Sequence, residues 1–474
     1  MSKEASHDTQ GAHAEEGGER ASSLDITNDA FDELAARAVE LVSDYFRRVG
    51  EIPVLTQTPA PELAAQFDAP LAPGAPDSLD ALFADCRRIF EGSRHSSHPR
   101  FFGYVASPAT PVGAFADLIA SALNQNVPAW RSAPAATEVE HTVIRWLAAL
   151  AGYTPAEGAG GLLTSGGSMA NLNALYVAHR TKARAKTSGD EGAATTTTHS
   201  VDVDASATAR DVNDAATGGV DDAAAGGVDD ATLAGGVDVS QKGLWRAARP
   251  ATVYVSDQAH MSIAKAADIL GLGREQVRVV ETDEKFRMDV GRLRERIERD
   301  RRDGFQPFCI VASAGTVNTG AIDPLAGIAK VAREHDLWFH VDGAYGALAH
   351  ADPSKRTRLA GLKEADSVSL DPHKWLYTPV DCGCLLFRDP SAVRAAWAGS
   401  EADYIKIFEE TERESYAFFD YGAELSRRFR ALKIWMLLRY YGAERISAAI
   451  AEDNALAAYF AARVEAATDF ELLA

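Results

Sequence analysis

Short apolar segments alternate with amphipathic segments along residues 251–345. The apolar segments are rich in β-branched residues and lie at 251–256, 276–281, 308–315 and 337–345. The segments between them carry apolar residues at helical spacing and lie at 261–271, 290–304 and 325–336. Such alternation predicts strand–helix units, and therefore an α/β fold with a mostly parallel sheet. Ligands of these sheets bind at the carboxyl ends of the strands, where candidate site residues are expected.

The same pattern continues on both sides of this region. Residues 161–180 combine a short apolar strand, a glycine turn and a helix, and two more helices are expected at 114–126 and 134–153. Residues 23–49 form an amphipathic pattern, whereas 50–76 are proline-rich and expected to be extended.

Changes in composition divide the chain into parts. Residues 186–242 are rich in Gly, Asp, Ala and Thr, with a short imperfect repeat that favours low-complexity disorder over a calcium-binding array. The predicted parts are a disordered tail at 1–23, a helical arm at 24–115, a large domain at 116–432 with an insert at 186–242, and a partial, truncated C-terminal domain at 433–474.

Composition excludes several classes of protein. The 474 residues are 46% hydrophobic and carry a formal net charge of −20, which opposes binding to nucleic acid or anionic lipid. No run of apolar residues is long enough for a membrane span, and the polar first residues resemble no secretory signal, so a cytoplasmic protein is expected. Cys382 and Cys384 lack the further ligands that a zinc site requires, and no metal is predicted.

The segment SLDPHKW places a lysine, Lys374, two residues after Pro372. Because Pro372 disfavours a regular helix or strand across this point, the lysine is expected on a turn or loop. Apolar segments at 368–370 and 382–387 flank it, so the turn is expected to connect two buried strands. A lysine in partly apolar surroundings has a lowered pKa and can form a Schiff base with a carbonyl compound.

Other polar residues follow predicted strands in the same way. A glycine turn with Ser168 opens a helix, where backbone N–H groups can hold a phosphate. Asp342 ends a buried strand and needs a cationic partner, which a protonated ring nitrogen would supply. His260 and Thr316 follow two further strands; each could serve only a local turn or cap, yet together these groups are what pyridoxal phosphate requires.

The chain resembles the group II pyridoxal-phosphate-dependent decarboxylases, the family of aromatic-L-amino-acid, glutamate and histidine decarboxylases. The motif DPHKW, preceded by HVDGAYG, carries the resemblance, and RFFGY, SAPAATEVE and SRRFRALKIW add to it. The resemblance implies an aminotransferase-type (fold type I) domain that binds pyridoxal 5'-phosphate, and a homodimer with its active site at the subunit interface.

The resemblance also implies roles for individual residues. Lys374 would bind the cofactor covalently, Asp342 would pair with its ring nitrogen, and His260 would stack on its ring. The remaining cofactor contacts would be Ala344 on the opposite face, Gly167, Ser168 and His373 at the phosphate, Thr316 near the ring hydroxyl and Asp371 beside the lysine.

The substrate and the product are less narrowly defined. Tyr404, matched by its distance from the lysine, would be the catalytic proton donor, which favours an amine over an aldehyde product. Tyr104 and Pro108 match a segment that lines the substrate pocket of aromatic amino acid decarboxylases. Gln125 and Asn126 are polar for such a pocket, so an acidic or diamino acid stays open beside an aromatic one. An aldehyde synthase also stays open, as does an inactive protein that only binds the cofactor.

Overall fold

The computed structural model describes residues 24–68, 78–153, 160–182, 244, 249–397 and 415–474. The predicted tail and the predicted insert lie outside these residues. Internal contacts divide the chain into two units, residues 1–102 and 103–474, so that residues 103–115 group with the larger unit.

The described residues of the first unit form the helices α1 (Asn28–Arg48), α2 (Ala60–Phe67) and α3 (Leu79–Glu91). Helix α1 begins where the Thr27 hydroxyl accepts a hydrogen bond from the backbone N–H of Ala30, at 3.2 Å. The expectation of an extended segment was wrong for residues 60–67, which form α2. A proline in the first turn of a helix is compatible with helical geometry, because its missing N–H would have no partner there.

The second unit is built on a seven-stranded sheet in the order β1-β7-β6-β5-β4-β2-β3. All its strands are parallel except β7, which runs antiparallel to both of its neighbours. This confirms the predicted mostly parallel sheet. The strands are β1 (Gly160–Thr164), β2 (Ala251–Ser256), β3 (Val277–Val280), β4 (Gln306–Ser313), β5 (Trp338–Asp342), β6 (Ser367–Leu370) and β7 (Gly383–Phe387).

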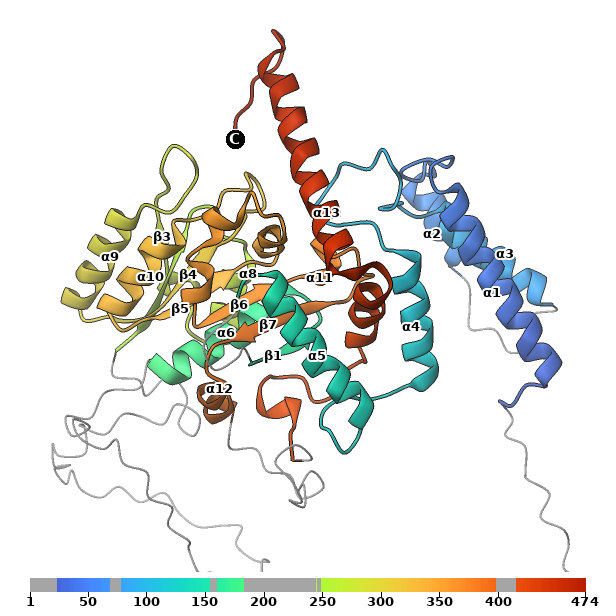
Figure 1. Cartoon of the computed structure of the whole chain (residues 1–474), viewed down its shortest axis with the longest axis horizontal. Helices are drawn as coiled ribbons and strands as arrows, with labels where there is room; N and C mark the ends of the chain where they lie inside the picture. The colour runs from blue at the N-terminus through green and yellow to red at the C-terminus, as the bar shows by residue number, and fades with distance from the viewer. Residues whose placement is uncertain (1–23, 69–77, 154–159, 183–243, 245–248, 398–414) are drawn as a thin grey trace, which may run out of the picture. The chain divides into compact units, whose positions relative to one another are not determined.

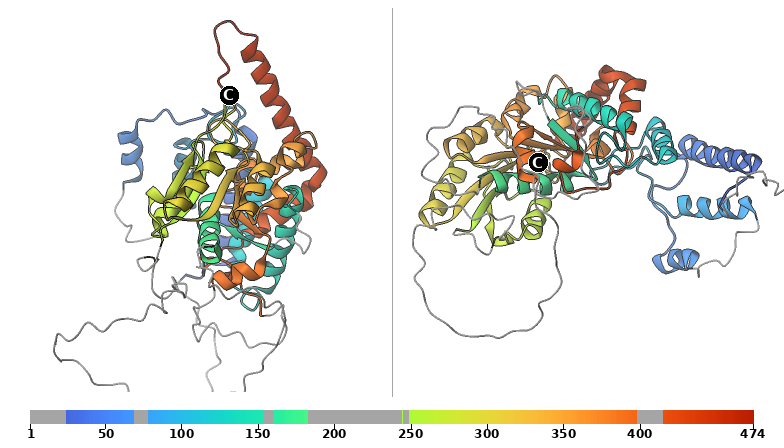
Figure 2. Two further views of the ribbon diagram at one scale, coloured as in Figure 1. Left: turned by 90° about the vertical axis from the view of Figure 1, so that its left-hand side faces the viewer. Right: turned by 90° about the horizontal axis from the view of Figure 1, so that it is seen from below.

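Helices cover both faces of this sheet (Figures 1 and 2). Helix α6 crosses strands β4 to β7 and packs beside α8 and α12, whereas α5, α9 and α10 pack against the other face. The helices are α4 (Pro111–Leu123), α5 (Pro134–Leu150), α6 (Gly167–Lys182), α8 (Ser262–Ile269), α9 (Val290–Arg302), α10 (Leu325–Glu334), α11 (Pro372–Trp375), α12 (Pro390–Trp397) and α13 (Ala431–Glu465). Short 3₁₀ turns lie at Arg274–Gln276, Ala347–Ala351, Arg356–Leu359, Leu362–Glu364 and Phe418–Asp420.

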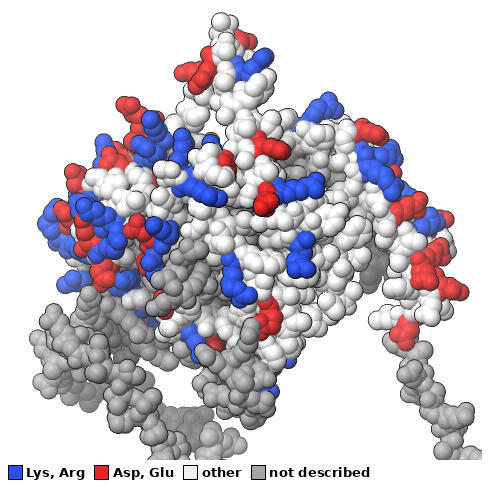
Figure 3. Space-filling model, viewed as in Figure 1, with Lys and Arg blue, Asp and Glu red and all other residues white. Residues whose placement is uncertain are grey.

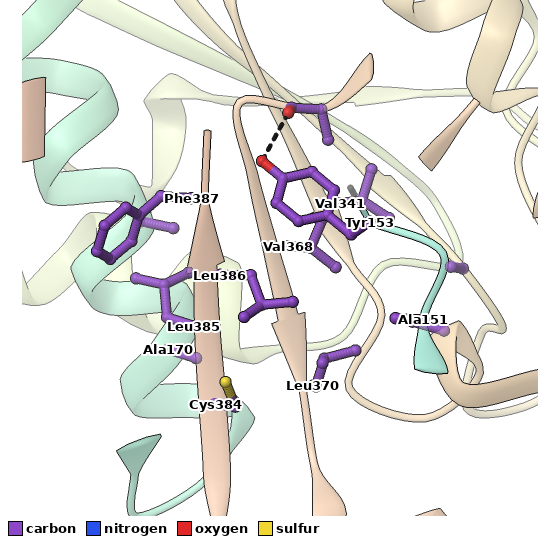
Figure 4. Packing of buried hydrophobic residues seen from close by; sticks show 14 of the residues in the cluster. Ala151, Tyr153, Ala170, Val341, Val368, Leu370, Cys384, Leu385, Leu386 and Phe387 are labelled. Atoms are coloured by element: carbon purple, nitrogen blue, oxygen red, sulfur yellow. Dashed lines mark hydrogen bonds between the residues drawn. The ribbon is translucent and has the colours of Figure 1, made fainter. Parts of the chain in front are cut away.

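The core lies on both sides of the central strands, and β4 and β7 are accordingly almost continuously apolar (Figure 4). Val341, Val368 and Leu386 are fully buried on three neighbouring strands. Tyr153 is also fully buried, and its hydroxyl donates a hydrogen bond of 3.0 Å to the backbone oxygen of Ala365. The phenol therefore enters the core without leaving a polar atom unpaired.

Charged side chains of both signs are interspersed on the surface over α9 and α10 (Figure 3). Arg294 of α9 pairs with Glu334 of α10, for example. Among the helices in the described ranges, none is long and apolar enough to cross a membrane.

A buried ion pair supports the edge of the sheet at β1. The Arg427 and Glu140 side chains pair at 1% and 0% exposure. Glu140 Oε1 accepts a hydrogen bond from Leu163 N, and Arg427 donates to Leu163 O at 2.9 Å and to Val127 O at 2.7 Å. The pair thus binds both backbone groups of one β1 residue, just before the glycine turn.

Replacing Arg427 with methionine is expected to destabilise the protein by about 3–5 kcal/mol, because Glu140 would keep its buried charge without a partner. The measurement is the free energy of unfolding in urea. The control is Arg394→Met, which breaks an exposed pair with Asp420 and should cost no more than about 1 kcal/mol. Equal effects of the two substitutions would contradict a structural role for the buried pair.

Candidate active site

One cavity of about 410 Å³ lies at the carboxyl ends of the strands, a size typical of small-molecule sites. Five strand-to-helix connections contribute residues to it, those that follow β1, β2, β4, β5 and β6. The predicted site residues that line this cavity are Gly167, Ser168, His260, Thr316, Asp342, Ala344, Asp371, His373 and Lys374. Residues expected at the carboxyl ends of the parallel strands are thus brought together in one cavity.

Lys374 lies in α11, a single helical turn that begins at Pro372. The prediction of a turn or loop without helix was therefore wrong in detail. Pro372 starts the helical turn instead of interrupting it, because a proline is tolerated at the first helical position. The Lys374 side chain is 21% exposed, and its Nζ lies 2.8 Å from Asp371 Oδ2.

Asp371 is buried beside the lysine, at 2% exposure. Burial raises the pKa of its carboxyl, while the positive charge of Lys374 acts in the opposite direction. Among the described residues, none donates a hydrogen bond to its second oxygen, Oδ1. This oxygen is therefore a buried acceptor without a partner among those residues, which adds to the cost of keeping the carboxyl charged.

Asp342 ends β5 and is held by three neutral donors. Asn171 Nδ2 donates to its Oδ2 at 2.8 Å, while Ser369 Oγ and Ala344 N donate to its Oδ1 at 3.1 and 3.2 Å. In the described part of the chain, no basic side chain forms an ion pair with this carboxylate. The site thus offers a fixed, buried anion to a cationic ligand group.

His260 and Thr316 differ in their exposure, and the side chains of both form local hydrogen bonds. The His260 ring is exposed at the cavity, and its Nδ1 lies 2.9 Å from Ser262 Oγ. Thr316 is buried, and its hydroxyl bonds Thr319 Oγ1 at 2.7 Å and accepts from Ala321 N at 3.1 Å. Thr316 therefore does serve as a turn hydroxyl, and it lines the cavity as well.

The glycine turn after β1 leads directly into α6, which begins at Gly167. A Cβ at Gly167 would lie 2.9 Å from both Ala344 Cβ and Asp371 Oδ2, so that only glycine fits there without a shift. His373 closes this side of the cavity, where its Nδ1 accepts a hydrogen bond of 3.1 Å from Cys382 N. Burial lowers the pKa of this imidazole.

Comparison with known proteins identifies this arrangement. The model of the pyridoxal-dependent decarboxylase conserved domain matches residues 61–212 and 242–474. The chain belongs to the pyridoxal-dependent decarboxylase family. It is 32% identical to aromatic-L-amino-acid decarboxylase of Bacillus atrophaeus, over 95% of this chain and 80% of that protein. It is 28% identical to phenylacetaldehyde synthase of Arabidopsis thaliana, over 92% and 78% of the two chains.

Solved structures agree with this assignment. The crystal structure of Oryza sativa TDC with PLP and tryptamine superposes with a TM-score of 0.76 at 27% identity, covering 94% of this chain and 81% of that chain. The chain is a pyridoxal-phosphate-dependent amino acid decarboxylase of fold type I, and its cofactor is pyridoxal 5'-phosphate. The site fits this group, since it combines a lysine amine, a buried carboxylate and an N-terminal helix turn in which a Cβ is excluded.

Two of the predicted residues are not brought to the cavity of this decarboxylase, and a third falls on a part of the chain that the structure does not describe. Tyr404 lies outside the described residues. Tyr104 and Pro108 are exposed on an irregular segment before α4 and do not line the cavity. The rule that parallel strands bring their carboxyl ends together cannot predict the position of this segment, because the segment does not follow a strand of the sheet.

Two side chains that hold Asp342, those of Asn171 and Ser369, were not predicted from the sequence. The position of each relative to a predicted site residue gives a reason to expect it there. Asn171 lies four residues after Gly167, and residues at this spacing share one face of a helix. Ser369 lies on the strand beside β5, opposite Asp342 in register.

Proposed function

We propose that this decarboxylase converts an aromatic L-amino acid to its amine and carbon dioxide. The convergence of Lys374, Asp342 and His260 on one cavity is the observation that carries the chemistry. The aromatic substrate is supported by the name of the Bacillus atrophaeus relative and by the tryptamine present in the Oryza sativa structure.

The proposed roles follow from the positions of the side chains. When bound, the cofactor supplies a conjugated ring that accepts the electrons left by the departing carboxylate. Lys374 would hold the cofactor covalently, and Asp342 would keep a proton on the ring nitrogen. His260 and Ala344 would contact the two ring faces, and Thr316 the ring hydroxyl. The proposed phosphate and lysine contacts are Gly167, Ser168, His373 and Asp371.

The polar residues that left an acidic or diamino substrate open have other contacts. Asn126 Oδ1 accepts a hydrogen bond of 2.8 Å from Arg427 N, and Gln125 Nε2 donates to Leu123 O at 3.3 Å. Neither side chain lines the cavity around Lys374. These two amides therefore give no support for a polar pocket in the cavity of one chain, and the aromatic substrate rests on the named relatives.

We further propose that two copies of the chain form a homodimer that completes the substrate pocket. Tyr104 is 81% exposed and Val380 is 73% exposed. Helix α4 adds an exposed apolar face with Leu118 and Ile119. Large exposed apolar side chains of this kind are typical of a protein–protein interface. Tyr104 and Pro108 would then reach substrate across the interface instead of within one chain.

The test is to incubate the purified protein with pyridoxal phosphate and a panel of aromatic, acidic and diamino L-amino acids. Carbon dioxide and amine are expected from tryptophan, tyrosine or phenylalanine, with little from glutamate or diaminobutyrate. Bound cofactor without turnover of any amino acid would instead support the inactive binding protein. Aldehyde with hydrogen peroxide would support the aldehyde synthase, an activity that the name of the Arabidopsis relative makes worth measuring.

Tyr404 is proposed as the acid that returns a proton to the substrate carbon after carbon dioxide leaves. Replacing it with phenylalanine is expected to shift the product in air from amine toward aldehyde, because a carbon that is not protonated quickly can be oxidised by dioxygen, which is reduced to hydrogen peroxide while water releases the nitrogen as ammonia. The amine-to-aldehyde ratio is the measurement. A ratio equal to that of the wild type would remove Tyr404 from this role.

A further inference from the structure

Asn171 lies at the centre of a buried hydrogen-bond chain beneath the cavity. Its side chain is 1% exposed on α6. Its Nδ2 bonds Asp342 Oδ2 at 2.8 Å and Ser262 Oγ at 2.9 Å, and its Oδ1 lies 3.0 Å from His340 Nε2. One amide thus joins α6 to two residues of β5 and to the start of α8.

The orientation of this amide follows from its partners. The Asp342 carboxylate only accepts hydrogen bonds, so the NH₂ group of Asn171 must face it. The amide oxygen then faces His340, whose Nε2 must carry the hydrogen. Burial lowers the pKa of His340 to about 4, so that this imidazole is neutral near neutral pH. Its unprotonated Nδ1 can accept from Ser367 Oγ, at 2.8 Å.

The second amide hydrogen of Asn171 connects it to His260 through the Ser262 hydroxyl. Ser262 Oγ accepts from Asn171, which leaves the serine hydroxyl hydrogen for His260 Nδ1 at 2.9 Å. The backbone N–H of Ser262 also points to this Nδ1, at 3.3 Å. Because Nδ1 accepts, the neutral His260 ring carries its hydrogen on Nε2.

We propose that Asn171 is a positioning residue that stabilises the charged form of Asp342 and sets the proton position on His260, by donating one amide hydrogen to Asp342 and the other to Ser262, which in turn donates to His260. The inference rests on the proposed function, in which these two residues contact the cofactor. A donor on Asp342 Oδ2 stabilises the charged carboxylate that the ring nitrogen needs. The same amide acts on His260 through Ser262. Because Nδ1 of His260 accepts from Ser262, the ring hydrogen lies on Nε2.

The substitution Asn171→Asp isolates this role, since it keeps the shape of the side chain and exchanges a donor for an acceptor. A second carboxylate would then lie 2.8 Å from Asp342, and two carboxylates at this distance must share a proton. The other ionisable groups facing this position are His340 on β5, His260 before α8, and Asp371 and Lys374 at α11.

The experiment is a titration of pyridoxal phosphate into the wild type, Asn171→Asp and Asn173→Asp, followed by absorption across the pH range in which each protein stays folded. Asn173 is the matched control. It is buried on the same helix at 1% exposure, but its amide bonds Met169 O and Ala423 N instead of lining the cavity. A melting temperature is measured for each protein, and borohydride reduction tests the lysine linkage.

For Asn171→Asp, we expect the dissociation constant of the cofactor to rise about tenfold or more, the effect of losing a hydrogen bond to a charged group. The absorption of the bound cofactor should also change with pH differently from that of the wild type. Asn173→Asp should retain the wild-type spectrum and affinity. If Asn171→Asp does not fold, Asn171→Ala replaces it; the loss of the donor should weaken cofactor binding in the same direction and alter the spectrum, without a second carboxylate that titrates.

Three results would overturn the inference. An unchanged spectrum and affinity in the folded Asn171 variant would show that the amide does not act through Asp342 or His260. Equal changes in the Asn171 and Asn173 variants would show only a general disturbance of α6. Absence of borohydride-fixed cofactor in the wild type would overturn the proposed residue roles themselves, and this failure is distinguishable because it precedes any substitution.

Discussion

Replacing Lys374 with alanine is expected to abolish covalent binding of the cofactor and to lower kcat on the order of 10⁴-fold or more, the scale on which loss of a nucleophile acts. The α11 turn brings Lys374 against Asp371 in the cavity, with Nζ 2.8 Å from Asp371 Oδ2. The measurement is the fraction of cofactor fixed to the protein by borohydride, together with carbon dioxide release.

The control for this substitution is Lys265→Ala, which removes an exposed lysine of α8 outside the cavity. It should leave both the fixed fraction and the rate as in the wild type. Cofactor fixed equally in Lys374→Ala and in the wild type would contradict the assignment of this lysine, while the family assignment would be unaffected.

Asp342→Asn is expected to lower kcat by about 10²–10³-fold, the range found when one preorganised electrostatic group is removed from an active site. The asparagine keeps the shape of the side chain and can still accept a hydrogen bond from Asn171, but it lacks the negative charge that would hold a proton on the ring nitrogen. Because the charge would act mainly on electrons that develop during the reaction, kcat should fall more than the affinity for substrate.

Asp342→Glu separates charge from position at the same site. It retains the carboxylate but lengthens the side chain in a place where Asn171, Ser369 and Ala344 hold the oxygens. An intermediate activity is expected. A kcat for Asp342→Asn within a few-fold of the wild type, in a protein that melts normally, would show that the charge of Asp342 does not contribute.

The alternation of apolar and amphipathic segments was enough to predict the sheet and most helices that surround it. Burial on both faces favours an almost entirely apolar central strand, as in β4 and β7, and this pattern is local in the sequence. The residues directly after strands were likewise predictable, because parallel strands bring their carboxyl ends to one edge of the sheet. Lys374, Asp342 and His260 were found by this rule.

Local rules were less reliable where a proline opened a helix. Residues 60–67 and the turn at Pro372 were expected to be non-helical, yet both are helical. A proline disfavours helix only where its N–H and its ring meet a preceding turn, and at the first helical positions there is no preceding turn.

The sequence by itself indicated the family, the cofactor and many of the residues that line the cavity, since each of these belongs to a short motif with its own chemistry. Only the tertiary structure decided how those residues are held. Asn171 and Ser369 bond Asp342 from a helix and a neighbouring strand, 171 and 27 residues away in the chain. A hydrogen bond depends on distance and direction between atoms, and no local pattern records which distant side chain packing will bring within reach.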